Sequence, residues 1–224
     1  MMIKNIIFDC DGVLVDTVTP HYQIMSEYLT ERCITMTAAE IVAEFSGAMW
    51  KSFFPVLEER FSVTLPETVY NDLRDAMLEY DHTVGLEACK DVNVLLHEPS
   101  LKKACASNSS TATLKKHVAD HAWENVFETL VGVDQVENPK PAPDLYLMAL
   151  KEAGFEAQET VVIEDSPTGV MAGKAAGMQV IAYTGVYPDK AERTELMKAA
   201  GADWVMDDYS EILTFLTGAA DKAA

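Results

Sequence analysis

The sequence predicts an α/β fold, a doubly wound parallel sheet that is interrupted after its first strand by an inserted helical block. Two patterns predict this class. Short β-branched and aromatic runs alternate with helix-like segments over most of the chain, as in sheets whose strands are connected by helices. Residues from about 18 to 82 instead show apolar spacings of three and four, which are typical of helices. The chain has 224 residues, 49% of them apolar, and so can form a large core domain and a smaller inserted one.

The first strand is the apolar run Ile3–Phe8, short and β-branched like a strand buried on both faces. It leads directly to two acidic residues, Asp9 and Asp11, with only Cys10 between them. Side chains alternate in extended backbone, so both carboxylates point one way and Cys10 points the other. Two carboxylates this close repel each other, and their pairing needs a chemical reason.

The inserted block has an apolar helical face at Phe53, Phe54, Leu57 and Phe61. Pro66 fits the first turn of a further helix that runs toward Tyr80. No convincing strand pattern occurs in this block. We therefore expect a helical domain over residues 17–86 and an α/β core formed by residues 1–16 and 87–224.

The remaining elements alternate. We expect helices near Lys90–His97, Thr111–Ala119, Pro143–Ala153 and Pro167–Ala176, and strands at Lys103–Ala106, Phe127–Val131, Thr160–Ile163 and Gln179–Tyr183.

The charge and the cysteines limit the classes of function. Lys and Arg number 17 against 36 Asp and Glu, and this net charge of −19 repels nucleic acid and anionic membranes. No apolar stretch approaches the roughly 20 residues that span a bilayer, and no signal peptide is evident. We expect a cytoplasmic protein. The four scattered cysteines are typical of reduced thiols and not of a disulfide framework.

Polar residues follow the strands where each of them ends, the edge at which such sheets place functional groups. These segments are Asp9–Gly12, Ser107–Ser110, Asn138–Pro141 and Glu164–Ser166. Carboxylates from two strand ends suit a hard cation, for which Mg²⁺ fits best. A remaining carboxylate can attack a phosphoryl group. Lys140, Ser107, Asn108 and the N–H groups near Gly12 can then stabilise the phosphoryl oxygens.

Each segment by itself also has a plain structural interpretation. The first fits a turn after a strand, the second a helix N-cap, the third a rigid loop with a solvated lysine, and the fourth a cap followed by proline. Their joint placement at the strand ends of one sheet favours a single site.

The segments DCDGVLVDT, ASNSS, KPAPD and IEDSPTG resemble the four motifs of the haloacid dehalogenase (HAD) superfamily, in the same order and spacing. The resemblance covers nearly the whole chain. It is closest to the subgroup with a helical cap inserted after the first motif, as in β-phosphoglucomutases and sugar-phosphate phosphatases. The resemblance implies a Rossmann-like core, a cap at residues 17–86 and a Mg²⁺ cofactor.

The resemblance also implies roles for individual residues. Asp9 matches the nucleophile that forms an aspartyl phosphate, and Asp11 matches the general acid and base. The metal ligands would be Asp9, the backbone carbonyl of Asp11 and Asp165, with Glu164 acting as a ligand or through water. Phosphate binding falls to Lys140, Ser107, Asn108 and Gly12.

Two residues of the inserted block are candidates for contact with substrate. His21 stands where many relatives carry a histidine that faces the site, although a helix-surface histidine explains it equally well. Lys51 lies in the segment GAMWK, which matches a substrate loop of the cap. A solvated lysine is the alternative for Lys51, and the neighbouring Trp50 suits the core of the cap.

The leading functional hypothesis is a Mg²⁺-dependent phosphatase of small phosphorylated metabolites, such as sugar or polyol phosphates. The first alternative is a phosphosugar mutase, but Asn108 and Trp50 replace a small apolar residue and an arginine that the resemblance leads us to expect there. A non-enzymatic phospho-acceptor signalling domain is the second alternative, although it needs neither the cap nor Asp11. A cysteine nucleophile at Cys10 has no histidine beside it in these motifs.

The expected partner is a small phosphorylated molecule, with no nucleic acid and no membrane. No pattern specifies the oligomeric state, and a monomer is the default expectation. Substrate identity is equally undetermined, because it depends on side chains of the cap.

Overall fold

The structure, a computed structural model, describes residues 3–45 and 50–218, with the backbone alone for 50–52. Its chain divides into two compact units. The core unit comprises Met1–Val15, Ala88–Val186 and Lys190–Ala224, and the helical unit comprises Asp16–Glu87 with Tyr187–Asp189. The assignment of residues 17–86 as a cap stays a prediction.

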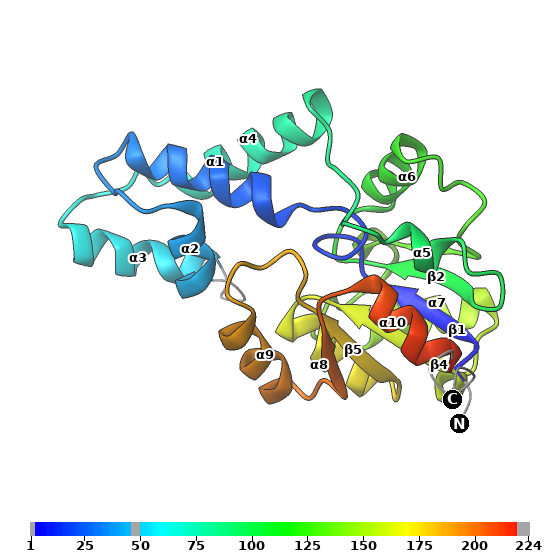
Figure 1. Ribbon diagram of the computed structural model, residues 1–224. Coiled ribbons are helices and arrows are strands. Elements are labelled where there is room, and N and C mark those ends of the chain that lie inside the picture. Colours follow the sequence, from blue (N-terminus) through cyan, green and yellow to red (C-terminus); the bar gives the residue numbers. More distant parts are fainter. Residues whose placement is uncertain (1–2, 46–49, 219–224) are drawn as a thin grey trace. The chain divides into compact units, whose positions relative to one another are not determined.

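The core unit contains a six-stranded parallel sheet in the order β3-β2-β1-β4-β5-β6 (Figure 1). The strands are β1 (Asn5–Phe8), β2 (Lys102–Ala106), β3 (Leu130–Val131), β4 (Thr160–Glu164), β5 (Gln179–Tyr183) and β6 (Trp204–Met206). Phe8 at the end of β1 is in register with Cys105 on one side and Ile163 on the other. The residues that follow these three strands therefore meet at one edge of the sheet.

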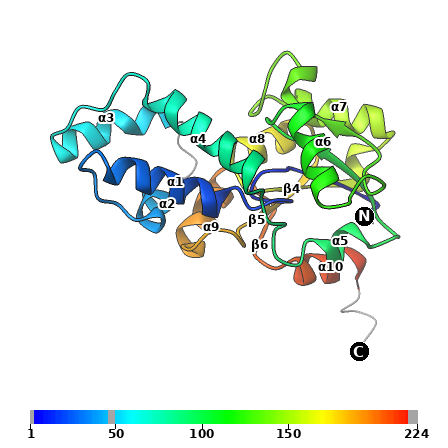
Figure 2. The same cartoon turned by 90° about the horizontal axis from the view of Figure 1, so that it is seen from above.

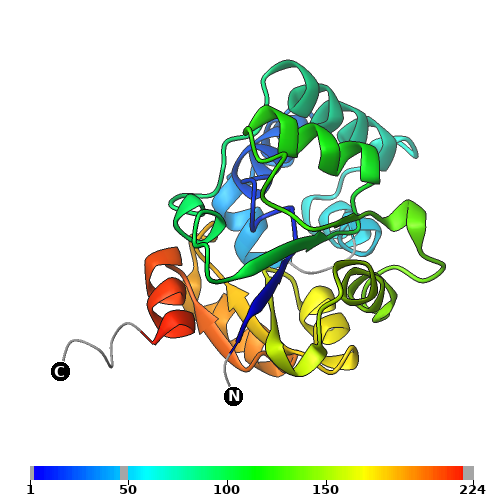
Figure 3. The same ribbon diagram turned by 90° about the vertical axis from the view of Figure 1, so that its right-hand side faces the viewer.

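Helices cover both faces of this sheet. They are α5 (Asn93–Leu96), α6 (Thr111–Asp120), α7 (Asp144–Ala153), α8 (Pro167–Ala175), α9 (Lys190–Ala199) and α10 (Tyr209–Thr217). Figures 2 and 3 show α7 and α8 on one face, and α5 and α10 together on the other. The predicted doubly wound α/β core is confirmed.

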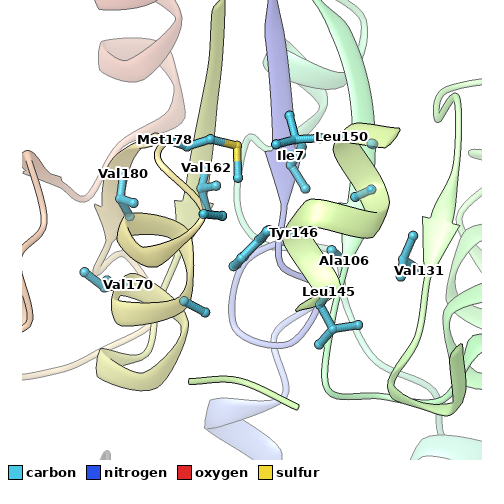
Figure 4. Packing of buried hydrophobic residues seen from close by; sticks show 14 of the residues in the cluster. Ile7, Ala106, Val131, Leu145, Tyr146, Leu150, Val162, Val170, Met178 and Val180 are labelled. Atoms are coloured by element: carbon cyan, nitrogen blue, oxygen red, sulfur yellow. The ribbon is translucent and has the colours of Figure 1, made fainter. Parts of the chain in front are cut away.

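The central strands are buried on both faces, which explains their continuous apolar sequences. Every residue of β1 and β4 is buried. On one face, Tyr146 of α7 and Val170 of α8 pack in the same cluster as Ile7 and Val162 (Figure 4). Each such side chain stabilises the fold by about 1.5–3 kcal/mol relative to an exposed position, and this packing fixes the strand ends that carry the polar segments.

The helical unit contains α1 (Val18–Thr30), α2 (Ala38–Phe45), α3 (Trp50–Phe61) and α4 (Val69–Thr83). Its own apolar core includes Leu29 of α1, Leu57 of α3 and Leu73 of α4, each fully buried. The described residues of this unit contain no strand, as the spacing of the apolar residues predicts. No helix in the described ranges is both long enough and apolar enough to cross a bilayer.

The structure differs from the sequence prediction at several element boundaries. The third strand is limited to Leu130–Val131, because it pairs only with β2 while Phe127 turns edge-on against Phe8. The helix predicted near Lys90–His97 is reduced to α5, since Asp91 has a left-handed φ of 62° that interrupts helical backbone.

Two further differences lie in the helical unit and near the C-terminus. Helix α4 begins at Val69 and not at Pro66, whose carbonyl accepts from the Val69 N–H in a preceding turn (2.9 Å). The sequence prediction also omitted β6, α9 and α10. Strand β6 is apolar but has only three residues, too few for a recognisable strand pattern, and α9 has a mostly polar sequence.

Candidate active site

The carboxyl ends of β1, β2 and β4 bring the predicted site residues together. Asp9 directly follows β1, Ser107 directly follows β2, and Glu164 ends β4. Lys140 reaches the same place from the loop that precedes α7, although it is distant from all three in the sequence. The four polar segments therefore form one cluster, as their positions at the strand ends predict.

Asp9 is a buried carboxylate held by two neighbours. Its N–H donates to the Ile163 carbonyl (2.9 Å), which fixes the backbone against β4. Its Oδ1 accepts a hydrogen bond from Lys140 Nζ at 2.7 Å. Burial, together with the charges of Glu164 and other nearby carboxylates, raises the pKa of Asp9 well above its usual value, although Lys140 opposes this shift.

Lys140 is the buried cation of the cluster. Its Nζ donates to Asp9 Oδ1 and Glu164 Oε1, both at 2.7 Å, and to the Ala106 carbonyl at 2.9 Å. All three ammonium donors are therefore used. Burial alone would lower the pKa of Lys140, but the two carboxylates outweigh it and raise that pKa well above the usual value.

Glu164 is the residue of the cluster that accepts hydrogen bonds from several of its neighbours. Its side chain is completely buried. Oε1 accepts from Lys140 Nζ and from Tyr146 OH at 2.8 Å, and Oε2 accepts at 3.0 Å from the N–H groups of Asp165 and Ser166 and from the Ser166 hydroxyl. Burial by itself would raise the pKa of Glu164, but Lys140 and these other donors hold it below the usual value.

The cluster fits a divalent cation in its charge and its ligands. Oxygens of Asp9, Glu164 and Asp165 lie within 4.8 Å of one another. A carboxylate has about four lone-pair directions, and five donors already occupy those of Glu164, so Asp9 and Asp165 are the better ligands. One ammonium group, that of Lys140, faces three carboxylates, so Lys140 alone does not balance their charge. A cation with oxygen ligands would supply the missing positive charge.

Asp11 lies in a different environment from Asp9. Its Oδ2 accepts from the Ser109 hydroxyl at 2.6 Å and from the Ser107 hydroxyl at 3.2 Å. The Ser109 N–H in turn donates to Ser107 Oγ (3.1 Å). One acid of the pair is thus held by an ammonium group and the other by neutral hydroxyls.

Gly12 and Asn108 support the backbone of the site. Gly12 has a left-handed φ of 71°, which favours glycine, and its N–H donates to the Val15 carbonyl (2.8 Å) in the turn after Asp11. The side-chain carbonyl of Asn108 accepts from the Lys140 N–H (3.1 Å). This bond orients the amide, so that its NH₂ group is the part left to donate elsewhere. The phosphate-binding roles of both residues stay predictions.

Cys10 is buried, and its surroundings disfavour the thiolate form. A hydrogen bond with Cys105, burial and the neighbouring Asp11 and Asp9 carboxylates hold the pKa of its thiol well above the usual value. Because the thiolate is the reactive form, this environment disfavours cysteine catalysis.

His21 and Lys51, the two candidates for contact with substrate, belong to the helical unit and not to the core unit that contains the cluster. His21 Nε2 lies 2.8 Å from Asp81 Oδ1, a contact that joins the start of α1 to the end of α4 within the helical unit. The Lys51 side chain and residues 47–49 of the GAMWK segment lie outside the described part of the structure. A substrate-binding role for His21 or Lys51 stays a prediction.

The sequence analysis missed four residues that support the site. Tyr146 binds Glu164, Ser109 binds Asp11, Tyr209 OH donates to the Val13 carbonyl (2.5 Å), and Arg193 donates to the Asp165 carbonyl. Only Ser109 belongs to a segment that the analysis singled out. The other three lie on helices, where no local pattern distinguishes a supporting polar group from a surface one.

The family model described as "Haloacid dehalogenase-like hydrolase" matches residues 6–183, which include all four polar segments. The chain is a haloacid dehalogenase-like hydrolase. This HAD assignment confirms the enzyme class, and it excludes the non-enzymatic signalling domain as the explanation of the clustered acids.

The names of similar proteins support this family assignment. A solved HAD-like protein of unknown function from Agrobacterium tumefaciens has a TM-score of 0.87 and 27% identity, covering 97% of this chain and 99% of its own. A HAD family hydrolase from Deinococcus radiodurans, solved with bound phosphate and sodium, has a TM-score of 0.82 and 26% identity, covering 97% and 96%. "Phosphorylated carbohydrates phosphatase" of Thermotoga maritima is 28% identical over 191 residues, 80% of this chain and 83% of the relative.

Proposed function

We propose that this HAD hydrolase is a Mg²⁺-dependent phosphatase of small phosphorylated metabolites, such as sugar or polyol phosphates, and that it acts through an aspartyl phosphate formed at Asp9. The observation that carries the proposal is the contrast between the two acids of the DCD segment. Lys140 favours the ionised form of Asp9, while the hydroxyls at Asp11 are compatible with either protonation state.

In the first step, an oxygen of the Asp9 carboxylate attacks phosphorus, and the bond from phosphorus to the ester oxygen breaks. Asp11 gives its proton to that oxygen, so the organic part leaves as an alcohol. Lys140 stays bonded to Asp9 and faces the charge on the transferring group. Ser107 and the Asn108 NH₂ group supply hydrogen-bond donors to the phosphoryl oxygens.

In the second step, Asp11, now a carboxylate, accepts a proton from water as the water oxygen attacks the same phosphorus. Inorganic phosphate leaves and Asp9 is restored as a carboxylate. The protons balance over the cycle, because Asp11 donates one and regains one.

Asp9, Asp165 and the carbonyl of Asp11 would hold the Mg²⁺ ion. When bound, this cation offsets the repulsion among the carboxylates and stabilises charge on the phosphoryl oxygens. Glu164 contributes indirectly, because it positions both Lys140 and the Asp165 backbone.

Hydrolysis is favoured over phosphoryl transfer within a sugar phosphate. The Thermotoga maritima relative is named as a phosphatase of phosphorylated carbohydrates. Asn108 also departs from the small apolar residue that we expect in a mutase. The mutase remains the second candidate, and isomerisation of a sugar phosphate without phosphate release would support it.

The proposal is tested by phosphate release from a panel of sugar, polyol and aryl phosphates, with Mg²⁺ and with a chelator. We expect metal-dependent release that falls by at least about 10³-fold in Asp9→Asn, since that variant loses the attacking carboxylate. Asp134→Asn changes an exposed acid and is the matched control. Full activity in Asp9→Asn would exclude Asp9 as the nucleophile.

A second variant separates the two steps. Asp11→Ala should still accept phosphate from an activated aryl phosphate but should release it slowly, because no group activates the water. Mass spectrometry of the quenched protein should then show a phosphorylated Asp9. Steady-state turnover equal to the wild type would contradict the acid and base role of Asp11.

A further inference from the structure

The Ser109 hydroxyl makes the shortest contact of Asp11. It donates to Oδ2 at 2.6 Å, whereas the Ser107 hydroxyl reaches the same oxygen at 3.2 Å. Within the described residues, no hydrogen bond is directed at Oδ1 of Asp11. The two oxygens of this carboxyl group are therefore not equivalent.

This difference determines which oxygen of Asp11 is left for a further partner. Ser109 and Ser107 both contact Oδ2, and the short bond from Ser109 holds the carboxyl group at that oxygen. Oδ1, which receives no hydrogen bond from the described residues, is therefore the oxygen that can exchange a proton with a bound molecule.

We propose that Ser109 is a positioning residue that holds the Asp11 carboxyl by Oδ2, so that Oδ1 is the oxygen left to act on the leaving group. This inference rests on the proposed function, in which Asp11 is the general acid. As the bond from phosphorus to the ester oxygen breaks, Oδ1 loses its proton to that oxygen, and Oδ2 keeps its bond from Ser109 throughout.

Ser109 is better suited to this task than Ser107. Ser107 is buried, its hydroxyl also accepts from the Ser109 N–H, and its donor is required by the phosphoryl group in the proposed mechanism. When Ser107 turns to the phosphoryl group, Ser109 is the remaining donor to Asp11. The backbone of Ser109 is fixed as well, since its carbonyl accepts from the Val133 N–H (3.0 Å).

The reactivity of the leaving group provides the test. Phenyl phosphate and 4-nitrophenyl phosphate have similar shapes, but nitrophenolate leaves readily without a proton whereas phenolate benefits from one. The ratio kcat/KM reports the steps up to leaving-group departure. We therefore expect Ser109→Ala to lower kcat/KM about tenfold or more for phenyl phosphate, and less than about twofold for 4-nitrophenyl phosphate.

Three variants serve as references. Asp11→Ala should also lower kcat/KM more for phenyl phosphate than for 4-nitrophenyl phosphate, and the difference between the two substrates should be larger than in Ser109→Ala. Ser109→Thr keeps the hydroxyl and should restore most of the rate with phenyl phosphate. Ser110→Ala alters the adjacent serine, which caps α6 by accepting from the Thr113 N–H (3.1 Å), and should change both substrates equally.

The outcomes separate this inference from the function on which it rests. An equal loss with both substrates in Ser109→Ala, or no loss with either, would overturn the positioning role and leave the phosphatase intact. Wild-type protein without metal-dependent phosphate release, or with release that survives in Asp9→Asn, would overturn the proposed function and this inference with it.

Discussion

Glu164 illustrates how one buried side chain can orient several other groups of a site. Five donors surround its carboxylate, and two of them belong to Lys140 and to the N–H of Asp165. A buried carboxylate is costly unless it is paired and hydrogen-bonded, and here both conditions hold. The same bonds that stabilise the charge also align a cation and a proposed metal ligand.

Gly169 provides a test of this arrangement at the scale of one residue. A Cβ at this position would lie 1.6 Å from Glu164 Oε1 and 1.9 Å from Cδ. Because its five donors hold Glu164 in place, Gly169→Ala should lower the free energy of unfolding by about 1–3 kcal/mol or more. It should also impair phosphate release by displacing Lys140.

Urea unfolding and the phosphatase assay together measure this effect. Thr168→Ala, which alters an exposed residue in the same turn of α8, is the control. Wild-type stability and activity in Gly169→Ala would show that Glu164 is free to move.

The helices and strands of the core unit contribute to the candidate site mainly through the loops at their ends. The DCD turn after β1 is held from the opposite face of the sheet, where Tyr209 of α10 donates to the Val13 carbonyl. Tyr183 of β5 stacks on the Tyr209 ring, with centroids 4.4 Å apart. A helix that carries no motif thus restrains the turn that carries Asp11.

Helix α2 allows a prediction on pH dependence. Glu40 accepts from the Thr37 N–H and hydroxyl, both at 2.8 Å, and its own N–H donates to Thr37 Oγ1, which completes a capping box. The Thr37 N–H and then its hydroxyl hold the pKa of Glu40 below the usual value. The resulting stabilisation is present above the unfolded-state pKa, about 4.3, and is lost as the pH falls through the lower folded-state pKa.

Glu40→Ala should therefore melt below the wild type at neutral pH, and the difference in Tm should shrink as the pH falls below about 4. Thermal melts across this pH range measure the difference, with the exposed Glu59→Ala as control. A difference in Tm that stays constant with pH would exclude the ionised capping box as its cause.

At the scale of the whole molecule, the net charge opposes the proposed substrate. The chain carries −19, so an anionic phosphate ester meets repulsion until it reaches Lys140 and the cation. Screening by salt weakens such long-range repulsion, since the Debye length falls to about 10 Å at 0.1 M.

We therefore expect kcat/KM for anionic substrates to rise with added sodium chloride, by up to about tenfold from low ionic strength. Stopped-flow or initial-rate measurements at fixed Mg²⁺ provide the check, with sucrose as a non-ionic control. A fall in kcat/KM over the same range would mean that a local positive field outweighs the net charge.

Local sequence patterns are enough to predict the class of the fold and the ends of its central strands. Strands that are buried on both faces must be continuously apolar, and helices of the inserted block must repeat every three or four residues, so both leave clear local patterns. The DCD segment marked Asp9 and Asp11 because two carboxylates only two positions apart after a buried strand are costly without a function. The edge strand β6 left no such pattern, since its three residues are too few to show a periodicity, although all three are apolar.

Which polar groups contact one another depends on the packing of segments that are distant in the sequence. Ser109 contacts Asp11 across 98 positions of sequence, and Lys140 contacts Asp9 across 131. These contacts depend on the strand order that places β1 between β2 and β4, and on the register that aligns their ends. The surroundings of Glu164 depend on the same packing, because its five donors belong to α7, to the loop before α7 and to the loop after β4. Local sequence determines what each segment can become, whereas the packing of distant segments determines which side chains share a hydrogen bond.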